Sequence, residues 1–243
     1  MYRFRRFIPP LVFILQSISL VLIVIAASIT DTVSGTIGFI SHLADSYGAY
    51  IIFVVFNSLA YFLILYIHLY VWRNVLNFWD GNNWEFTGKP GVLRSLWTFA
   101  ELIIPILFYP FLPLLAIFDN EEYSTAHNIF VYLWGYPTFL QILITTWLLN
   151  KALVSRTRCS RVTNRISVLL KQFLILWLVF WALIYIIFSI AFNTQDDPDA
   201  GLRFGYIVAS VGQWSVFLGI FAWHATFYYE ISRIDDMRYN LLD

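Results

Sequence analysis

Apolar residues along the chain gather into six long runs separated by short polar segments. The runs cover residues 7–28, 50–72, 95–118, 126–149, 168–192 and 204–229. A bilayer core about 30 Å thick needs roughly 20 apolar residues in a helix, and each run is long enough. Lipid offers no partners for open backbone groups, and the runs lack the alternation typical of membrane barrel strands. The pattern predicts an all-α integral membrane protein, with residues 1–243 forming a single six-helix transmembrane domain.

The first run has some features of a secretory signal. Arg3, Arg5 and Arg6 precede it, and small residues occur near its end. The apolar stretch is longer than the roughly 7–15 residues of a typical signal sequence. We therefore expect this run to stay in the protein as a membrane anchor.

Three prolines distinguish the third run, at Pro105, Pro110 and Pro113. Proline has no backbone N–H and its ring clashes with the carbonyl one turn earlier. We expect the third helix to bend, with free carbonyls between Leu102 and Tyr109.

Composition and charge agree with the membrane assignment. Hydrophobic residues make up 60 % of the chain and charged residues 12 %, against about 25 % charged in ordinary soluble domains. The formal net charge is zero, so no overall basic field attracts nucleic acid, and membrane lipids are the expected partners. If the N-terminus is cytosolic, all but Arg203 of the fifteen Lys and Arg residues, Lys171 included, fall on the cytosolic side. The positive-inside rule thus predicts that both termini are cytosolic.

Three ionisable residues lie inside the apolar runs at a similar depth, near the cytosolic side: His68, Glu101 and His224. Polar groups in a membrane are costly and often functional. A Glu–His pair between helices could neutralise Glu101 or hold a proton. The alternative is a structural interhelical hydrogen bond, contributing about 0.6 kcal/mol on average.

A second polar group is predicted on the lumenal or outer side, where Asp119 and Glu121 end the third run and His127 opens the fourth. Carboxylates and an imidazole at one face could act as acid and base. The alternatives are a solvated loop or carboxylates that cap the fourth helix. No metal-ligand spacing and no glycine-rich nucleotide loop occurs, so no metal or cofactor is expected.

The segment between the fourth and fifth runs is basic and contains the chain's one cysteine, Cys159. Such clusters attract anionic headgroups at about 1 kcal/mol per residue, although the charges could also serve only as an orientation signal. A cysteine beside the membrane is a candidate for palmitoylation. The residues that could contact lipid headgroups or a partner are Arg156, Arg158, Arg161 and Arg165.

The last run carries the most informative string, with its motif residues at Gln213, Trp214, His224, Thr226 and Glu230. This string resembles the final helix of the Frag/DRAM/Sfk membrane-protein family. The spacing of eleven residues from Gln213 to His224 is similar to that of the post-GPI-attachment-to-proteins factor 2 branch. The acidic stretch before His127 and the end of the second run at Trp72-Arg73 also resemble that branch.

The resemblance implies lipid (fatty-acid) remodelling of GPI anchors, at the step in which lyso-GPI is reacylated. It implies the GPI-anchor lipid as substrate and the Golgi apparatus as location, with the endoplasmic reticulum, lysosome or plasma membrane as other compartments. It leaves open whether the protein is the catalyst or an accessory factor. On this interpretation His127, with Asp119 and Glu121, acts as general base on a glycerol hydroxyl, and the motif of the last run is structural or forms a second site.

The alternative function is a non-enzymatic membrane adaptor or regulator of the DRAM/Sfk type, linked to autophagy or phosphoinositides. In that case the basic segment and the tail from Glu230 to Asp243 would recruit a cytosolic partner.

Overall fold

A computed structural model describes residues 2–29, 40, 47–79, 90–118, 120–154, 163–191 and 203–239. Among these residues all regular elements are helices, and six spans are long and apolar enough to cross a membrane. The predicted all-α bundle of six transmembrane spans is therefore confirmed. The elements are η1 (Tyr2–Phe7), α1 (Ile8–Ile29), α3 (Tyr47–Trp79), α4 (Pro90–Thr98), η2 (Phe99–Ile103), α5 (Ile104–Phe108), α6 (Phe111–Ile117), α7 (Asn120–Val154), α8 (Arg165–Ala191), α9 (Arg203–Ala225) and α10 (Phe227–Tyr239).

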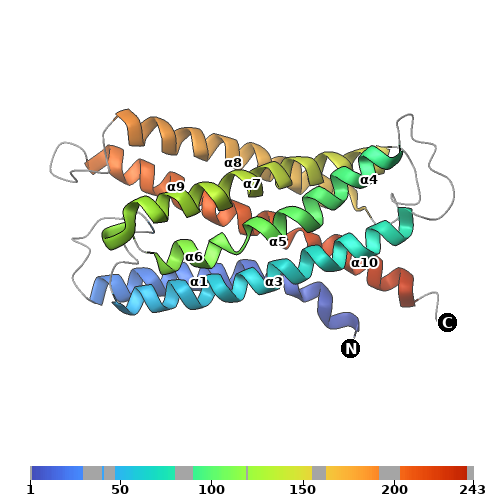
Figure 1. Ribbon diagram of the computed structural model, residues 1–243, viewed down its shortest axis with the longest axis horizontal. Coiled ribbons are helices and arrows are strands. Elements are labelled where there is room, and N and C mark those ends of the chain that lie inside the picture. Colours follow the sequence, from blue (N-terminus) through green and yellow to red (C-terminus); the bar gives the residue numbers. More distant parts are fainter. Residues whose placement is uncertain are drawn as a thin grey trace.

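The spans lie side by side along the long axis of the molecule, and both chain ends lie toward the same end of the bundle (Figure 1). Helix α1 packs against α3 and α9, while α6 packs against α7 and α3. Helix α8 packs mainly against α9 at the edge of the bundle. Only 6 % of the residues in its most apolar stretch are buried. The outer surface of α8 is therefore free to face lipid.

The third span is divided by its prolines, as the sequence predicts. Pro105 cannot donate to the carbonyl of Glu101, and the chain forms a π-helical turn, η2, in which Ile104 N–H donates to the Phe99 carbonyl five residues back. A second break follows α5, where Leu112 N–H donates to the Tyr109 carbonyl at 3.0 Å. These breaks put Glu101 in the π turn and Tyr109 at the corner between α5 and α6.

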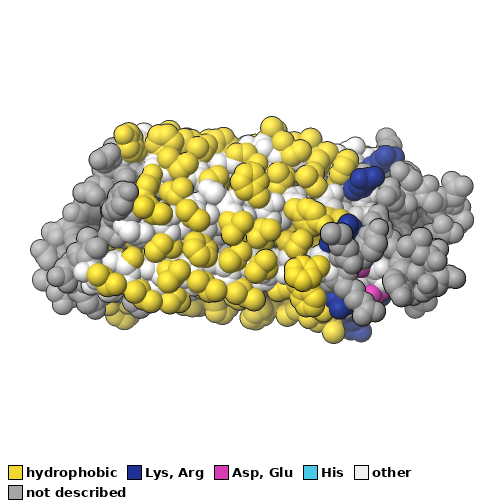
Figure 2. All heavy atoms as spheres, turned by 90° about the horizontal axis from the view of Figure 1, so that it is seen from below, with side chains coloured by type: hydrophobic (Ala, Val, Ile, Leu, Met, Phe, Trp, Pro, Cys, Tyr) yellow, Lys and Arg dark blue, Asp and Glu magenta, His cyan; other side chains and the backbone are white. Residues whose placement is uncertain are grey.

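The surface of the bundle carries a wide apolar belt, and basic side chains gather at one end of it (Figure 2). We call this the basic end. The order of the spans places the following described residues near helix ends on this side: Arg5, Arg73, Arg94, Lys151, Arg165 and Arg233. The chain ends lie toward the same end (Figure 1). That the basic end faces the cytosol remains a prediction from the positive-inside rule.

Two glycines allow α9 to approach α8 closely. A Cβ added at Gly212 would lie 3.1 Å from the backbone nitrogen of Tyr185 and 3.2 Å from the carbonyl oxygen of Trp181. One added at Gly219 would lie 2.8 Å from a methyl group of Leu178, at the flexible end of that side chain. Close helix contacts through small residues are typical of membrane bundles. Because backbone atoms face Gly212, this position is the less tolerant of the two.

We expect Gly212→Ala to lower the free energy of unfolding by about 1–3 kcal/mol, because α8 must shift to accommodate the methyl group. The matched control is Gly135→Ala on α7, where an added Cβ meets nothing within 4 Å. Thermal unfolding of the purified proteins in detergent gives the midpoint of each variant. Equal midpoints for the two variants would contradict close packing at Gly212.

The predicted topology can be tested with Cys159, which lies outside the described residues. Because the chain has one cysteine, a membrane-impermeant maleimide reports its side directly. We expect labelling only after the plasma membrane is permeabilised, or in vesicles whose cytosolic face is outward. Hydroxylamine treatment beforehand separates a palmitoylated cysteine from an inaccessible one, and labelling from the lumenal side would overturn the topology.

Candidate functional site

Buried polar side chains from five segments meet inside the bundle. We call them the histidine network, and its members are His68, Glu101, Tyr109, Gln141, Thr145 and His224. Each is at most 1 % exposed. Since lipid and apolar side chains surround them, these groups depend on one another for hydrogen bonds.

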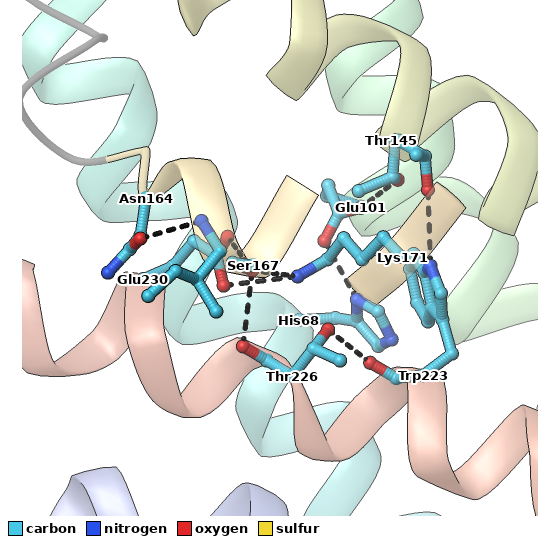
Figure 3. A network of polar contacts seen from close by, with 11 residues as sticks. His68, Glu101, Thr145, Asn164, Ser167, Lys171, Trp223, Thr226 and Glu230 are labelled. Carbon is cyan, nitrogen blue, oxygen red and sulfur yellow. Dashed lines mark hydrogen bonds and ion pairs between the residues drawn. The ribbon is translucent and has the colours of Figure 1, made fainter. Parts of the chain in front are cut away.

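A contact between an imidazole on α3 and a carboxyl group in the π turn lies at the centre of the network. His68 Nδ1 lies 2.8 Å from Glu101 Oε2, and both side chains are fully buried. The hydroxyl of Thr145, on α7, donates to the other carboxyl oxygen of Glu101 (Figure 3). Glu101 thus has a partner for each oxygen, one from α3 and one from α7.

A chain of contacts extends the network from His68 to His224. Gln141 Nε2 lies 3.1 Å from His68 Nδ1, and Tyr109 Oη lies 2.5 Å from Gln141 Oε1. Tyr109 Oη is also 3.0 Å from His224 Nε2. His224 Nδ1 is 2.8 Å from the carbonyl oxygen of Ile220. The network therefore connects the second, third, fourth and sixth spans.

A second buried cluster, which we call the lysine cluster, consists of Ser167, Lys171 and Glu230. Lys171 Nζ donates to Ser167 Oγ at 2.8 Å and to Glu230 Oε2 at 3.1 Å. The Ser167 hydroxyl donates to Glu230 Oε1 at 2.5 Å. Nζ also lies 4.4 Å from the centre of the Phe227 ring, a cation–π distance. The ammonium thus has three favourable partners although it is fully buried.

Aromatic rings separate the two clusters. Trp223 stacks on His68 with ring centres 6.4 Å apart, and its Nε1 donates to Thr146 at 3.1 Å. Phe227 meets the same imidazole edge-on at 5.4 Å while its ring faces Lys171. Figure 3 shows the lysine cluster from close by, together with His68, Glu101 and Thr145 of the histidine network. These rings lie between the two clusters and fill the space that water would otherwise occupy.

A break in the sixth span positions Glu230. Thr226 separates α9 from α10, and its hydroxyl donates to the Trp223 carbonyl at 2.6 Å. The Thr226 carbonyl accepts from Tyr229 N–H at 3.2 Å and lies 3.3 Å from Ser167 Oγ. Glu230 follows in the first turn of α10, within reach of α8.

The candidate residues at the opposite end are only partly described. His127 is 6 % exposed, and its Nδ1 lies 2.8 Å from the carbonyl oxygen of Phe118. Asp119 and the side chain of Glu121 lie outside the described residues, so the predicted grouping with His127 stays a prediction. Among the described residues no three His, Cys, Asp or Glu side chains are grouped as a metal site.

The remaining candidates fall into two groups. Gln213 Oε1 accepts from the backbone N–H of Ile40 at 2.9 Å, and Trp214 is partly buried against the core. Arg165 begins α8 and is exposed. The others, Arg156, Arg158, Cys159 and Arg161, lie outside the described residues. Their roles at the headgroups remain predictions.

Several members of the two clusters were not predicted from the sequence. The sequence predicted only that Lys171 lies toward the cytosolic side, and the structure adds that it is fully buried among helices. The sequence indicated this burial, because a lysine inside an apolar run requires a hydrogen-bond or charge partner on a neighbouring helix. Polar residues at 138, 141 and 145 on α7 also share one helical face. Tyr109 gave no such signal, since tyrosine is common in the apolar runs.

We expect Lys171→Met to destabilise the protein by about 3–5 kcal/mol, because the Glu230 carboxylate would remain buried without its countercharge. Lys171→Met combined with Glu230→Met should be less destabilised than the single variant, since both charges are gone. Thermal unfolding of the two variants in detergent tests this order. If the double variant is as unstable as the single one, the unpaired Glu230 carboxylate is not the cause of the destabilisation.

Comparisons with known proteins identify one family. A family model described as the Frag1/DRAM/Sfk1/Cwh43P N-terminal domain matches residues 4–234. No curated protein and no solved structure matches the chain. The match covers the first five spans, the sixth span up to residue 234, and both buried clusters. The chain therefore belongs to the Frag1/DRAM/Sfk1/Cwh43P family.

Proposed function

We propose that this protein takes part in fatty-acid remodelling of GPI anchors, at the step in which lyso-GPI is reacylated. The supporting observation is the placement of His224, the residue whose presence in the last span resembles the GPI-factor branch. Its two ring nitrogens contact Tyr109 and the Ile220 carbonyl inside the bundle. An imidazole held in this way has a defined role in the interior and is not an incidental surface residue.

The other motif residues support the same proposal. Thr226 forms the break between α9 and α10, and Glu230 binds Lys171 and Ser167 on α8. The motif that suggested the branch thus links the last span to its neighbours. In the proposed function it holds the helices around the lipid substrate.

His127 is the proposed general base. A carbonyl oxygen has no hydrogen, so the 2.8 Å contact with Phe118 requires the proton on His127 Nδ1. In neutral His127 the lone pair is then on Nε2, the form that can accept a proton from a hydroxyl group. The substrate hydroxyl in this proposal is the free glycerol hydroxyl of lyso-GPI, at the end of the bundle opposite the basic end.

The histidine network has a separate role from His127. Gln141 lies fourteen residues after His127 on the same helix, about 21 Å away at 1.5 Å per residue. The two sites cannot contact the same atoms of one substrate group. The network is therefore assigned to the interior of the bundle, and His127 to the chemistry at the membrane surface.

The proposal is tested by mass spectrometry of GPI-anchor lipids from cells with and without the protein. We expect lyso-GPI to accumulate, or the acyl composition to change, when the protein is absent. Complementation with His127→Gln should fail, because glutamine can still donate to the Phe118 carbonyl but cannot act as a base. As a control, the variant must insert into the membrane and show the same thermal unfolding midpoint as the wild-type protein.

Two outcomes would redirect the interpretation. Full complementation by His127→Gln would show that His127 is not the base. The proposed role in GPI-anchor remodelling would remain. An unchanged lipid profile in cells that lack any related protein would instead favour the adaptor function. In that case neutralising Arg156, Arg158 and Arg161 together should abolish recruitment of a cytosolic partner.

A further inference from the structure

The end of the third span is held by side chains from two neighbouring spans. The last four carbonyl groups of a helix have no partner within that helix. Two carbonyls at the end of α6 find partners elsewhere. The Tyr50 hydroxyl, on α3, donates to the Ile117 carbonyl at 3.2 Å, and His127 Nδ1, on α7, lies 2.8 Å from the Phe118 carbonyl oxygen. The second, third and fourth spans therefore meet at this helix end.

The peptide unit between Ile117 and Phe118 is hydrogen-bonded at both ends. Its carbonyl accepts from Tyr50, and its N–H group, which belongs to Phe118, donates to the Leu114 carbonyl at 2.9 Å. Because a peptide unit is planar, two contacts on opposite sides fix its orientation. Of the two partners, the Tyr50 hydroxyl is the one that comes from another span.

The direction of the next carbonyl follows from this peptide unit. Phe118 has a ψ angle of 90°, about 130° from the value in a regular helix. Its carbonyl therefore turns off the axis of α6 toward α7. The Phe118 ring packs against Tyr123 and Phe130 of α7, with ring centres 5.6 and 5.2 Å apart. With the preceding peptide and the ring both held, the carbonyl stays directed at His127.

This carbonyl selects the tautomer of His127. A neutral imidazole carries one hydrogen, and the hydrogen bond at one nitrogen determines which nitrogen has it. Since a carbonyl only accepts, the contact with Phe118 favours hydrogen on Nδ1 and leaves the lone pair on Nε2. With the hydrogen on Nε2 instead, two lone pairs would face each other at this distance. A base that acts through Nε2 thus depends on the direction of the Phe118 carbonyl.

We propose that Tyr50 is a positioning residue of the candidate site: its hydroxyl holds the Ile117–Phe118 peptide unit in the orientation that directs the Phe118 carbonyl to His127. It thereby keeps the Nε2 lone pair of His127 free for a substrate hydroxyl. The catalytic consequence rests on the proposed function, whereas the selection of the tautomer does not. Tyr50 acts through the backbone and does not contact the reacting atoms.

A tyrosine near the start of α3 also has a simpler explanation. Tyrosines are enriched at both membrane–water interfaces, where the ring lies in the headgroup region. An interfacial anchor requires no particular acceptor for its hydroxyl, and removing that hydroxyl would leave His127 unchanged. The two roles of Tyr50 therefore differ in one observable, the tautomer of His127.

Nitrogen NMR of the full chain with labelled histidine, in lipid bilayers at a pH at which the ring is neutral, distinguishes the tautomers. The His127 signals are assigned by their loss in His127→Gln. In the wild-type protein the form with hydrogen on Nδ1 should predominate. Tyr50→Phe keeps the ring and removes the hydroxyl. It should lower the ratio of the Nδ1–H to the Nε2–H form about two- to tenfold, the range that one net hydrogen bond supplies.

Tyr61→Phe is the matched control. Tyr61 is also partly buried, and it lies eleven residues further along α3, about 16 Å from Tyr50 at 1.5 Å per residue. Its loss should leave the tautomer ratio of His127 unchanged. Thermal unfolding in detergent shows whether Tyr50→Phe folds. If it does not, a fluorinated tyrosine in place of Tyr50, which is a stronger donor of similar shape, should raise the ratio.

Three results would overturn the positioning role. The first is a wild-type His127 whose hydrogen is on Nε2. The second is a folded Tyr50 variant with an unchanged tautomer ratio. The third is an equal fall in Tyr61→Phe, because the effect would then not pass through the Ile117 carbonyl.

Analysis of GPI-anchor lipids separates this inference from the proposed function. Complementation by Tyr50→Phe should be partial, between that of the wild-type protein and that of His127→Gln. Full complementation together with a lowered tautomer ratio would show that the positioning has no catalytic consequence. If the lipid profile does not depend on the protein at all, the proposed function fails, and the tautomer ratio still decides whether Tyr50 positions His127.

Discussion

The absence of water from the bilayer core is the constraint on which the buried part of this structure depends. A carboxylate, an ammonium group or an imidazole in that environment must find its hydrogen-bond partners on neighbouring helices. Glu101 lies 2.8 Å from the imidazole of His68, and Lys171 lies 3.1 Å from the carboxylate of Glu230. Lipid tails are as apolar as the surfaces of the helices, so apolar contact alone favours a neighbouring helix only slightly over lipid. A few polar contacts therefore determine how the spans are positioned relative to one another.

The irregular helices follow from the same constraint. A regular third span would not place Glu101 in a widened π turn or Tyr109 at a corner, and Pro105 makes the regular form unfavourable at this point. In the sixth span, the Thr226 hydroxyl donates to the Trp223 carbonyl, and the Thr226 carbonyl accepts from Tyr229 N–H. Backbone groups freed by each break form local hydrogen bonds, so the break costs little free energy. The same break orients the neighbouring side chains toward the interior.

The architecture was predictable from sequence because the length of an apolar run directly reflects the thickness of a bilayer. The common depth of His68, Glu101 and His224 was also readable from their positions along the runs, and the structure places His68 in contact with the other two. The choice of partners was not readable, since it depends on the rotation of each helix about its axis. Lys171 shows the difficulty: the charge was visible, but its burial depends on Glu230 from the following span.

Both buried polar pairs join spans that are consecutive in the chain. His68 and Glu101 belong to the second and third spans, and Lys171 and Glu230 to the fifth and sixth. A lone charge at the centre of a helix opposes membrane insertion by about 2.5–3.5 kcal/mol for Lys or Asp. During synthesis, the two members of each pair emerge on consecutive helices, so the two helices can leave the translocon as a hairpin. The order of the spans thus limits how long an unpaired charge is exposed to lipid during biogenesis.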